Sequence, residues 1–344
     1  MSTVHFVVPA GIDDPTRPSG GNAYDRRIID GLTAAGRTVH VHEVPGSWPS
    51  PDAQSLGALA AAVGSIPDGA LVLVDGIVAS PSPEVLAPAA GRLRLVVLVH
   101  MPLEQEREGT VLAAAAAVIA TSAWTRQALL DLYSLPGDRV HVAEPGVEPA
   151  ELAPGTATAG TLLSVAAVVP AKGHDLLLDA LAPLTDFSWQ CQCVGSLERD
   201  PAFVERLRRR ALDGRLDSRV CFLGVQPEAE LARSYASADV FVLASRVESY
   251  GMVVAEALAR GLPVVAADVG GVPEALGHGA DGTRPGLLVP PDDPVALREA
   301  IRSWLEDRGL RRRLRAAAHE RRAALTDWST TTSAVAGTLV GAAQ

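Results

Sequence analysis

Two glutamates and a glycine follow a strongly apolar segment in the second half of the chain. Glu248 and Glu256 are eight positions apart, and Gly251 lies between them, directly before Met252 and Val253. The first N–H groups of a helix that begins at this glycine, together with its dipole, can bind a diphosphate without added charge. Carboxylates beside such a helix suit the hydroxyl groups of a sugar. Taken alone, the glutamates are equally compatible with a favourable dipole contact and an exposed helix face.

A lysine and a histidine are further candidates. Lys172 follows the apolar run 162–169, and His100 ends the apolar run 95–99 at the carboxyl end of a predicted strand. Binding sites of α/β proteins form at that end of the strands. Gly20 and Gly21 precede the first predicted helix, where their backbone can approach a phosphate or an acceptor sugar. A solvated lysine, a histidine that caps a strand and a flexible glycine turn are the structural alternatives.

The segment 244–268 resembles the E-x7-E region of retaining family-4 glycosyltransferases, which have the GT-B fold. The likeness continues through GGVPE at 270–274 and extends back to 222–224 and 238–242. It implies that Glu248 contacts the hydroxyls of the donor sugar, that Glu256 holds the ribose hydroxyls, and that the backbone of Gly251, Met252 and Val253 meets phosphate. It also implies that His100 contacts the donor sugar, and that Gly20 and Gly21 line the cleft opposite the donor.

The segment 165–175, VAAVVPAKGHD, is similar to the family's segment VGRL-x-x-EKG-x-D. In that family an arginine and a lysine together neutralise the donor diphosphate, so the resemblance assigns this role to Lys172. Ala167 stands at the position of the arginine, which leaves the pair of cations incomplete. Arg246 and Arg199 are candidates for the missing charge, because guanidinium groups bind phosphate through paired N–H donors.

Short β-branched runs alternate with Ala- and Leu-rich segments of helical period, which predicts parallel strands joined by helical crossovers. We expect strands at 4–8, 38–44, 70–74, 93–100, 117–120, 140–143, 162–169, 190–194, 220–223, 240–243 and 264–267. With the resemblance, this predicts an α/β protein of the GT-B fold, in which two Rossmann-like domains face a central cleft. We assign residues 1–150 to an N-terminal acceptor-side domain, 151–325 to a C-terminal nucleotide-sugar-binding domain, and 326–344 to a helix that returns to the N-terminal domain.

Composition and missing motifs disfavour several other classes. The formal net charge of -10 argues against nucleic acid or an anionic membrane as a partner, and no apolar stretch is long enough to predict stable membrane insertion. Three cysteines without a CxxC pair predict a reducing, cytoplasmic location. Neither HExxH nor Asp-x-Asp occurs, so we expect no bound metal. The absence of GxGxxG after the first strand, of a P-loop motif and of GxSxG disfavours NAD enzymes, NTPases and hydrolases.

The sequence therefore predicts a retaining, metal-independent glycosyltransferase of the hexosyltransferase type, with Lys172, Glu248 and His100 as catalytic residues. A nucleotide diphosphate sugar is its expected donor substrate, and no cofactor is expected. A nucleotide-sugar epimerase of the same architecture is one alternative. A catalytically silent nucleotide-sugar-binding subunit is the other, and Ala167 motivates it. The acceptor, the base and sugar of the donor and the oligomeric state stay open.

Overall fold

The computed structural model describes residues 3–16 and 18–343. These residues form two compact units. Unit 1 contains the described chain up to Pro15, the segment Ser19–Gly146 and the described residues from Thr326 onward, whereas unit 2 contains Val147–Leu325 together with residues 16 and 18. The chain thus leaves unit 1 after Gly146 and returns to it at Thr326.

The described part of unit 1 contains a six-stranded parallel sheet in the order β2-β1-β3-β4-β5-β6. Its strands are β1 (Thr3–Pro9), β2 (Thr38–Val44), β3 (Leu71–Asp75), β4 (Arg94–Val99), β5 (Ala117–Ala120) and β6 (Val140–Val142). Its helices are α1 (Gly20–Ala34), α2 (Ala53–Gly64), α3 (Gly76–Ala79), α4 (Pro83–Ala89), α5 (Glu106–Ala114), α6 (Ala123–Tyr133), the 3-10 turn η1 (Gly137–Arg139) and α14 (Trp328–Ala342). Every residue of β3 is buried, as in a parallel strand that is covered on both faces.

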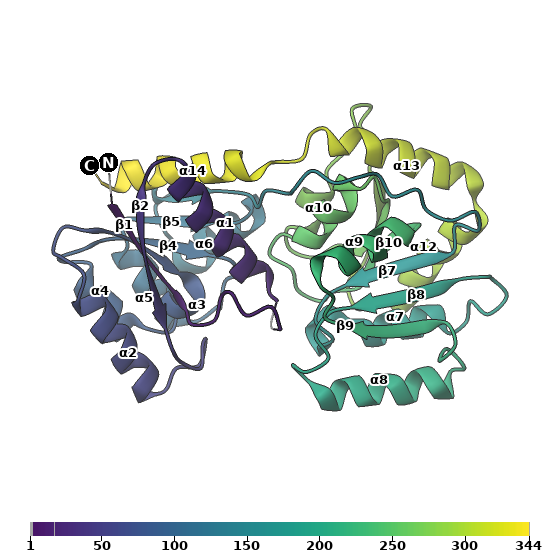
Figure 1. Ribbon diagram of the computed structural model, residues 1–344, viewed down its shortest axis with the longest axis horizontal. Coiled ribbons are helices and arrows are strands. Elements are labelled where there is room, and N and C mark those ends of the chain that lie inside the picture. Colours follow the sequence, from purple (N-terminus) through teal and green to yellow (C-terminus); the bar gives the residue numbers. More distant parts are fainter. Residues whose placement is uncertain (1–2, 17, 344) are drawn as a thin grey trace. The chain divides into compact units, whose positions relative to one another are not determined.

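Helix α14 joins the end of the chain to the beginning of unit 1. It packs against α1 (Figure 1), and its Val335 and Leu339 are buried in the same core as Tyr24 and Ile28 of α1. The side chain of Ser19 caps α1 by accepting a hydrogen bond from the backbone N–H of Asn22 at 3.1 Å. The cap fixes the start of α1, and the shared core holds the helix against α14 and the sheet.

The described part of unit 2 contains a second six-stranded parallel sheet, in the order β12-β11-β10-β7-β8-β9. Its strands are β7 (Thr161–Val165), β8 (Gln190–Val194), β9 (Val220–Gly224), β10 (Val240–Leu243), β11 (Val264–Ala267) and β12 (Gly286–Val289). Its helices are the 3-10 turn η2 (Pro170–Lys172), α7 (His174–Leu181), α8 (Pro201–Asp213), α9 (Glu228–Ser237), α10 (Met252–Ala259), α11 (Val272–Leu276), α12 (Pro294–Glu306) and α13 (Arg308–Arg322). This strand order is the one of Rossmann folds.

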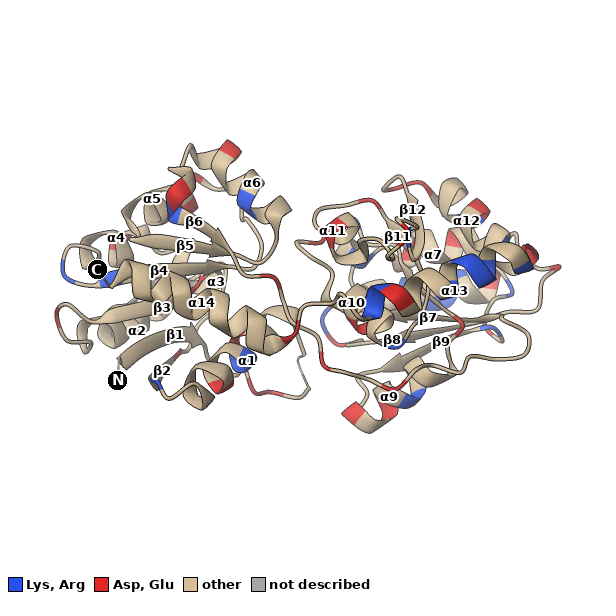
Figure 2. Cartoon of the chain, turned by 90° about the horizontal axis from the view of Figure 1, so that it is seen from above, with Lys and Arg blue, Asp and Glu red and all other residues tan. Residues whose placement is uncertain are grey.

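Helix α13 carries many charged residues (Figure 2) and is amphipathic. Leu314, Ala317 and Ala318 are buried, while its arginines cover the outer side and reach backbone carbonyls or carboxylates of unit 2. No helix within 3–16 and 18–343 is both long and apolar enough to cross a membrane.

Candidate functional site

The central strands of unit 2 form a topological switch point. β7 and β10 are neighbours, and the chain continues from β7 to β8 on one side and from β10 to β11 on the other. In open parallel sheets such a point leaves a crevice outside the carboxyl ends of the two strands. Lys172 lies in the turn η2 that follows β7, and Glu248 lies in the loop that follows β10. The sheet therefore brings both predicted residues to the place where ligands of Rossmann folds bind.

Lys172 and Glu248 form an ion pair at this edge. The Lys172 ammonium donates to Oε1 of Glu248 at 2.6 Å, and the hydroxyl of Ser245 donates to the same oxygen at 2.8 Å. The lysine side chain is 29% exposed and the glutamate side chain 12%. Among the described residues, none donates to Oε2 of Glu248. The pair is thus positioned by protein contacts and keeps one carboxylate oxygen for an external hydroxyl.

Close backbone packing brings the two loops together. Gly173 has a φ of +66°, and a Cβ at this position would overlap the carbonyl of Ala244 at the end of β10. The backbone N–H of Arg246 donates to the carbonyl of Ala171 at 2.8 Å. A residue with a side chain at position 173 would separate the loops, so the glycine after Lys172 has a positional role.

Helix α10 begins where the sequence predicts. Gly251 is its N-cap with a φ of +91°, and Met252 is its first residue. The helix leaves its first N–H groups, which include those of Met252 and Val253, without acceptors inside the helix. These donors follow Glu248 in the chain. The ammonium of Lys172, the carboxylate of Glu248 and the start of α10 therefore all follow the carboxyl ends of the neighbouring strands β7 and β10.

Glu256 lies in the second turn of α10 and is held by a residue that sequence patterns do not single out. The buried hydroxyl of Tyr235 donates to Oε2 of Glu256 at 2.9 Å, while the guanidinium of Arg260 stacks on the Tyr235 ring at 4.3 Å from its centroid. Burial raises the pKa of Glu256, against the opposing effects of the Tyr235 hydroxyl and of Arg260. Oε1 of Glu256 accepts from no described residue. Like Glu248, this glutamate keeps one oxygen for a ligand.

The two arginines considered as a second cation are engaged elsewhere. Arg246 makes a bidentate contact with Asp175 at 2.9 Å and a further ion pair with Asp292 at 2.6 Å. Arg199 donates to the carbonyl of Pro18 at 3.0 Å. Arg246 is held by Asp175 and Asp292, so Lys172 is the cation that contacts Glu248. It is also the only lysine among the 344 residues, a compositional signal that sequence analysis can use.

The remaining predicted residues belong to unit 1. Gly20 and Gly21 do not precede the first helix as predicted but are the first residues of α1, because Ser19 caps the helix two residues earlier. His100 follows β4. A Cβ on Gly21 would lie 3.2 Å from the imidazole of His100, so the first turn of α1 covers this ring. Nε2 of His100 is 2.9 Å from Oδ1 of Asp25 and 4.0 Å from Oδ1 of Asp75. The structure therefore brings together Gly21 and His100, and adds two carboxylates that the sequence pattern misses.

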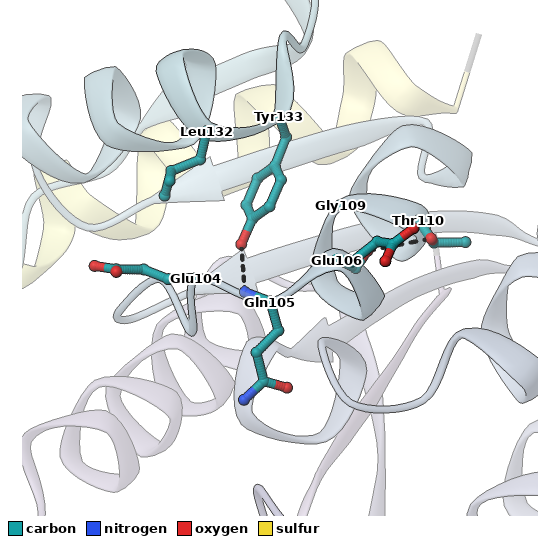
Figure 3. A pocket seen from close by; sticks show the side chains of 7 residues that line it. All are labelled: Glu104, Gln105, Glu106, Gly109, Thr110, Leu132 and Tyr133. Carbon is teal, nitrogen blue, oxygen red and sulfur yellow. Dashed lines mark hydrogen bonds between the residues drawn. The ribbon is translucent and has the colours of Figure 1, made fainter.

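Unit 1 also has an open cavity of about 550 Å³, which contains none of the predicted site residues. Its lining comes from α5, α6 and the segment before α5 (Figure 3): Glu104, Gln105, Glu106, Gly109, Thr110, Leu132 and Tyr133. The Tyr133 hydroxyl accepts from the backbone of Gln105 and donates to the buried Glu108. Two glutamates at its rim disfavour a phosphate ligand, so we do not assign the donor to this cavity.

Comparison with known families bears on the same unit. Residues 156–321 match the model of the family described as "Glycosyl transferases group 1". The matched residues include the whole site around Lys172, Glu248 and Glu256, so the sequence pattern and the family model describe one segment. The family resemblance is thus supported for this segment, whereas its assignment to the retaining family-4 branch stays a prediction.

Curated relatives carry glycosyltransferase names. A D-inositol 3-phosphate glycosyltransferase 1 of Catenulispora acidiphila is 33% identical over 238 residues, which are 63% of this chain and 55% of the relative. A D-inositol 3-phosphate glycosyltransferase of Frankia alni is 34% identical over 258 residues, which are 66% of this chain and 59% of the relative. The chain thus spans little more than half the length of these relatives.

Solved structures support the fold. A glycosyltransferase of Rickettsia africae superposes with a TM-score of 0.79 at 19% sequence identity, and the match covers 99% of this chain and 98% of the Rickettsia chain. HepE of Anabaena in complex with UDP and glucose superposes with a TM-score of 0.76 at 22% sequence identity, and the match covers 99% of this chain and 100% of HepE. These neighbours and the two parallel sheets confirm the predicted class, an α/β protein with two Rossmann-like domains of the GT-B type.

Proposed function

We propose that this chain is a glycosyltransferase that retains anomeric configuration, needs no metal and transfers a hexose from a nucleotide diphosphate donor to an acceptor. The observation that carries the proposal is the pairing of Lys172 with Glu248 at the β7/β10 switch point, directly before the start of α10. The family match over 156–321 and the names of the relatives support it. The three cysteines are free, which fits the cytoplasmic location that we also propose.

Transfer breaks the bond between the anomeric carbon and the diphosphate, so negative charge develops on the leaving phosphate. Lys172 and the first N–H groups of α10 would stabilise that charge, because fixed donors in a partly buried site need no reorganisation during the reaction. Oε2 of Glu248 and Oε1 of Glu256 would accept hydrogen bonds from hydroxyls of the sugar and the ribose. The family resemblance also makes His100 a candidate contact of the donor sugar.

The test of this function is a panel of uridine, guanosine and adenosine diphosphate sugars, screened by thermal shift and then by product analysis. The acceptor panel should begin with inositol phosphates, because relatives carry that name. We expect a glycosylated product with the donor's anomeric configuration, at the same rate with and without a chelator. A changed sugar that forms without acceptor would instead indicate an epimerase. Donor binding without turnover on every acceptor would indicate the silent subunit.

We expect Glu248→Gln to reduce turnover about 10- to 150-fold, which corresponds to the 1.5–3 kcal/mol of a hydrogen bond to a charged group. The amide keeps the size of the side chain and an acceptor for Ser245, but it removes the charge that orients Lys172. Steady-state rates with saturating donor measure the effect. Glu228→Gln, at the start of α9, is the matched control in unit 2. Equal turnover of wild type and Glu248→Gln would contradict the assignment.

Tyr235→Phe should raise the KM for the donor several-fold and leave kcat nearly unchanged. The phenylalanine keeps the buried ring and its contact with Arg260, but it no longer fixes Oε2 of Glu256. Losing one such hydrogen bond costs about 0.5–1.5 kcal/mol. Ser237→Ala, an exposed change at the end of the same helix, serves as the control. A lower kcat at unchanged KM would place Tyr235 in the chemical step and not in donor binding.

A further inference from the structure

Three ionisable side chains meet in unit 1 at the carboxyl ends of its central strands. Asp75 is the last residue of β3, His100 follows the neighbouring β4, and Asp25 reaches the same place from α1. Nε2 of His100 is 2.9 Å from Oδ1 of Asp25 and 4.0 Å from Oδ1 of Asp75. Asp25 is fully buried, the Asp75 side chain is 3% exposed and the His100 side chain is 19% exposed. Two carboxylates and an imidazole therefore form one largely buried cluster.

The charges of this trio favour a protonated imidazole over a neutral one. Two buried carboxylates without a compensating proton would leave two negative charges in a site with little access to water. Oδ2 of Asp25 is buried and has no hydrogen-bond donor among the described residues, so no donor stabilises the negative charge of the carboxylate at this oxygen. A proton on His100 is the nearest source of positive charge, since the 2.9 Å contact is already the length of a hydrogen bond.

The surroundings of His100 hold the ring in place without neutralising it. The ring of Tyr24 packs edge-on against the imidazole of His100, with the ring centroids 5.2 Å apart. The Tyr24 hydroxyl donates its hydrogen bond to the backbone carbonyl of Ala143. Gly21 of α1 covers the ring edge, and Thr121, after β5, donates to the backbone carbonyl of His100. Among the described residues, none bonds to Nδ1 of His100. One ring nitrogen is thus bound by Asp25 while the other is left for a ligand.

We propose that Asp25 and Asp75 are positioning residues which keep His100 as a doubly protonated imidazolium at neutral pH and leave its Nδ1–H available to an oxygen atom of a bound ligand. The ligand class is an anionic or hydroxyl oxygen, such as that of a phosphate or a sugar, because an imidazolium donates and does not accept. His100 would then act as a fixed cation and not as a general base. The contact to a ligand oxygen rests on the proposed function, in which His100 contacts the donor sugar, whereas the protonation of His100 is a property of unit 1 by itself.

The direction of the titration agrees with this geometry. Burial alone would lower the pKa of His100, but the charge and hydrogen bond of Asp25, helped by Asp75, raise it to about 9. Burial and the nearby Asp25 raise the pKa of Asp75 as well. Both groups bind protons more tightly in the folded chain, so their stabilising effect is complete at low pH and is lost as the pH rises. For His100 the loss falls between its ordinary pKa of about 6.5 and about 9.

The test is a pH titration of the full chain with isotope-labelled histidine, followed by NMR, with the His100 signal assigned through His100→Gln. We expect the wild-type signal to titrate well above about 6.5, and Asp25→Asn to lower its midpoint by about 1 to 3 units. Asp30→Asn, an exposed change on the same helix, should leave the midpoint unchanged. The denaturant midpoint of the wild type should fall with rising pH over the same interval, and that of Asp25→Asn should fall less.

Three results would overturn the proposal. The first is a wild-type His100 that titrates near its ordinary value, and this result decides the question even if Asp25→Asn fails to fold. The second is a folded Asp25→Asn variant with an unchanged midpoint. The third is a purified wild-type chain that carries a stoichiometric divalent metal, because the three side chains offer ligand atoms within 4.8 Å of one another and a metal would replace the protons.

Discussion

Replacing Lys172 by alanine should lower the turnover of the proposed transfer about 100- to 1000-fold, the loss expected when one fixed donor to a developing anion is removed. Lys172 is the only lysine of the chain, and the nearby Arg246 is held by Asp175 and Asp292, so no other lysine or arginine among the described residues contacts Glu248 in its place. The effect should fall mainly on kcat, since the charge on the leaving phosphate grows during the reaction. Initial rates with saturating donor measure it.

Two variants control this experiment. Lys172→Arg keeps the positive charge but replaces the compact ammonium by a planar guanidinium, so we expect a turnover rate between those of the wild type and Lys172→Ala. Arg209→Ala removes an exposed cation of α8 in the same unit and should leave the rate unchanged. If Lys172→Ala bound the donor and turned it over like the wild type, the assignment of the phosphate site would be wrong.

Replacing Gly270 by alanine should destabilise unit 2 by about 2–5 kcal/mol, the sum of a left-handed backbone penalty and of overpacking. Gly270 has a φ of +54°, and a Cβ there would overlap the carbonyl of Glu248, the residue that pairs with Lys172. The loop must shift to make room, so the donor site should be lost before the unit unfolds. Chemical denaturation and donor thermal shift, measured on the same variant, separate the two effects.

Gly282→Ala is the matched control. Gly282 has a φ of +83°, but a Cβ added there would meet no heavy atom of the described residues within 4 Å. The change therefore adds the left-handed penalty alone, about 1–2 kcal/mol. If Gly270→Ala and Gly282→Ala lost the same free energy of unfolding, the close contact between position 270 and the carbonyl of Glu248 would not contribute to the stability of unit 2.

The sequence predicts most of the strands, in part because strands buried on both faces, such as β5, β10 and β11, are continuous apolar runs. Strands β2, β5, β8, β10 and β11 have the predicted bounds. The run 162–169 is wrong in its second half, since β7 ends at Val165 and the chain turns at Ala167, whose carbonyl accepts from Val169. β12 is not predicted, because its three apolar residues follow a loop rich in glycine and proline.

The candidate site is predictable where its residues are adjacent to strand ends and only partly elsewhere. Lys172, Glu248 and the start of α10 follow from motif and position, and the lone lysine is a further signal in the composition. Tyr235, Asp25 and Asp75 could not be found in this way, because each acts through a partner that only the folded sheet brings near. The engagement of Arg246 by two carboxylates is likewise a consequence of folding, and it removes that arginine as the second cation.

The central claim is that Lys172 binds the diphosphate of the donor. Because the chain has one lysine, reductive methylation with isotope-labelled formaldehyde marks only Lys172 and the chain's amino terminus, and the methylated amine keeps its charge. NMR of the labelled protein should show the Lys172 signal shift on titration with the nucleoside diphosphate that stabilises the protein, and not with the matching nucleoside. A nucleoside diphosphate that binds while the Lys172 signal stays unchanged would contradict the claim.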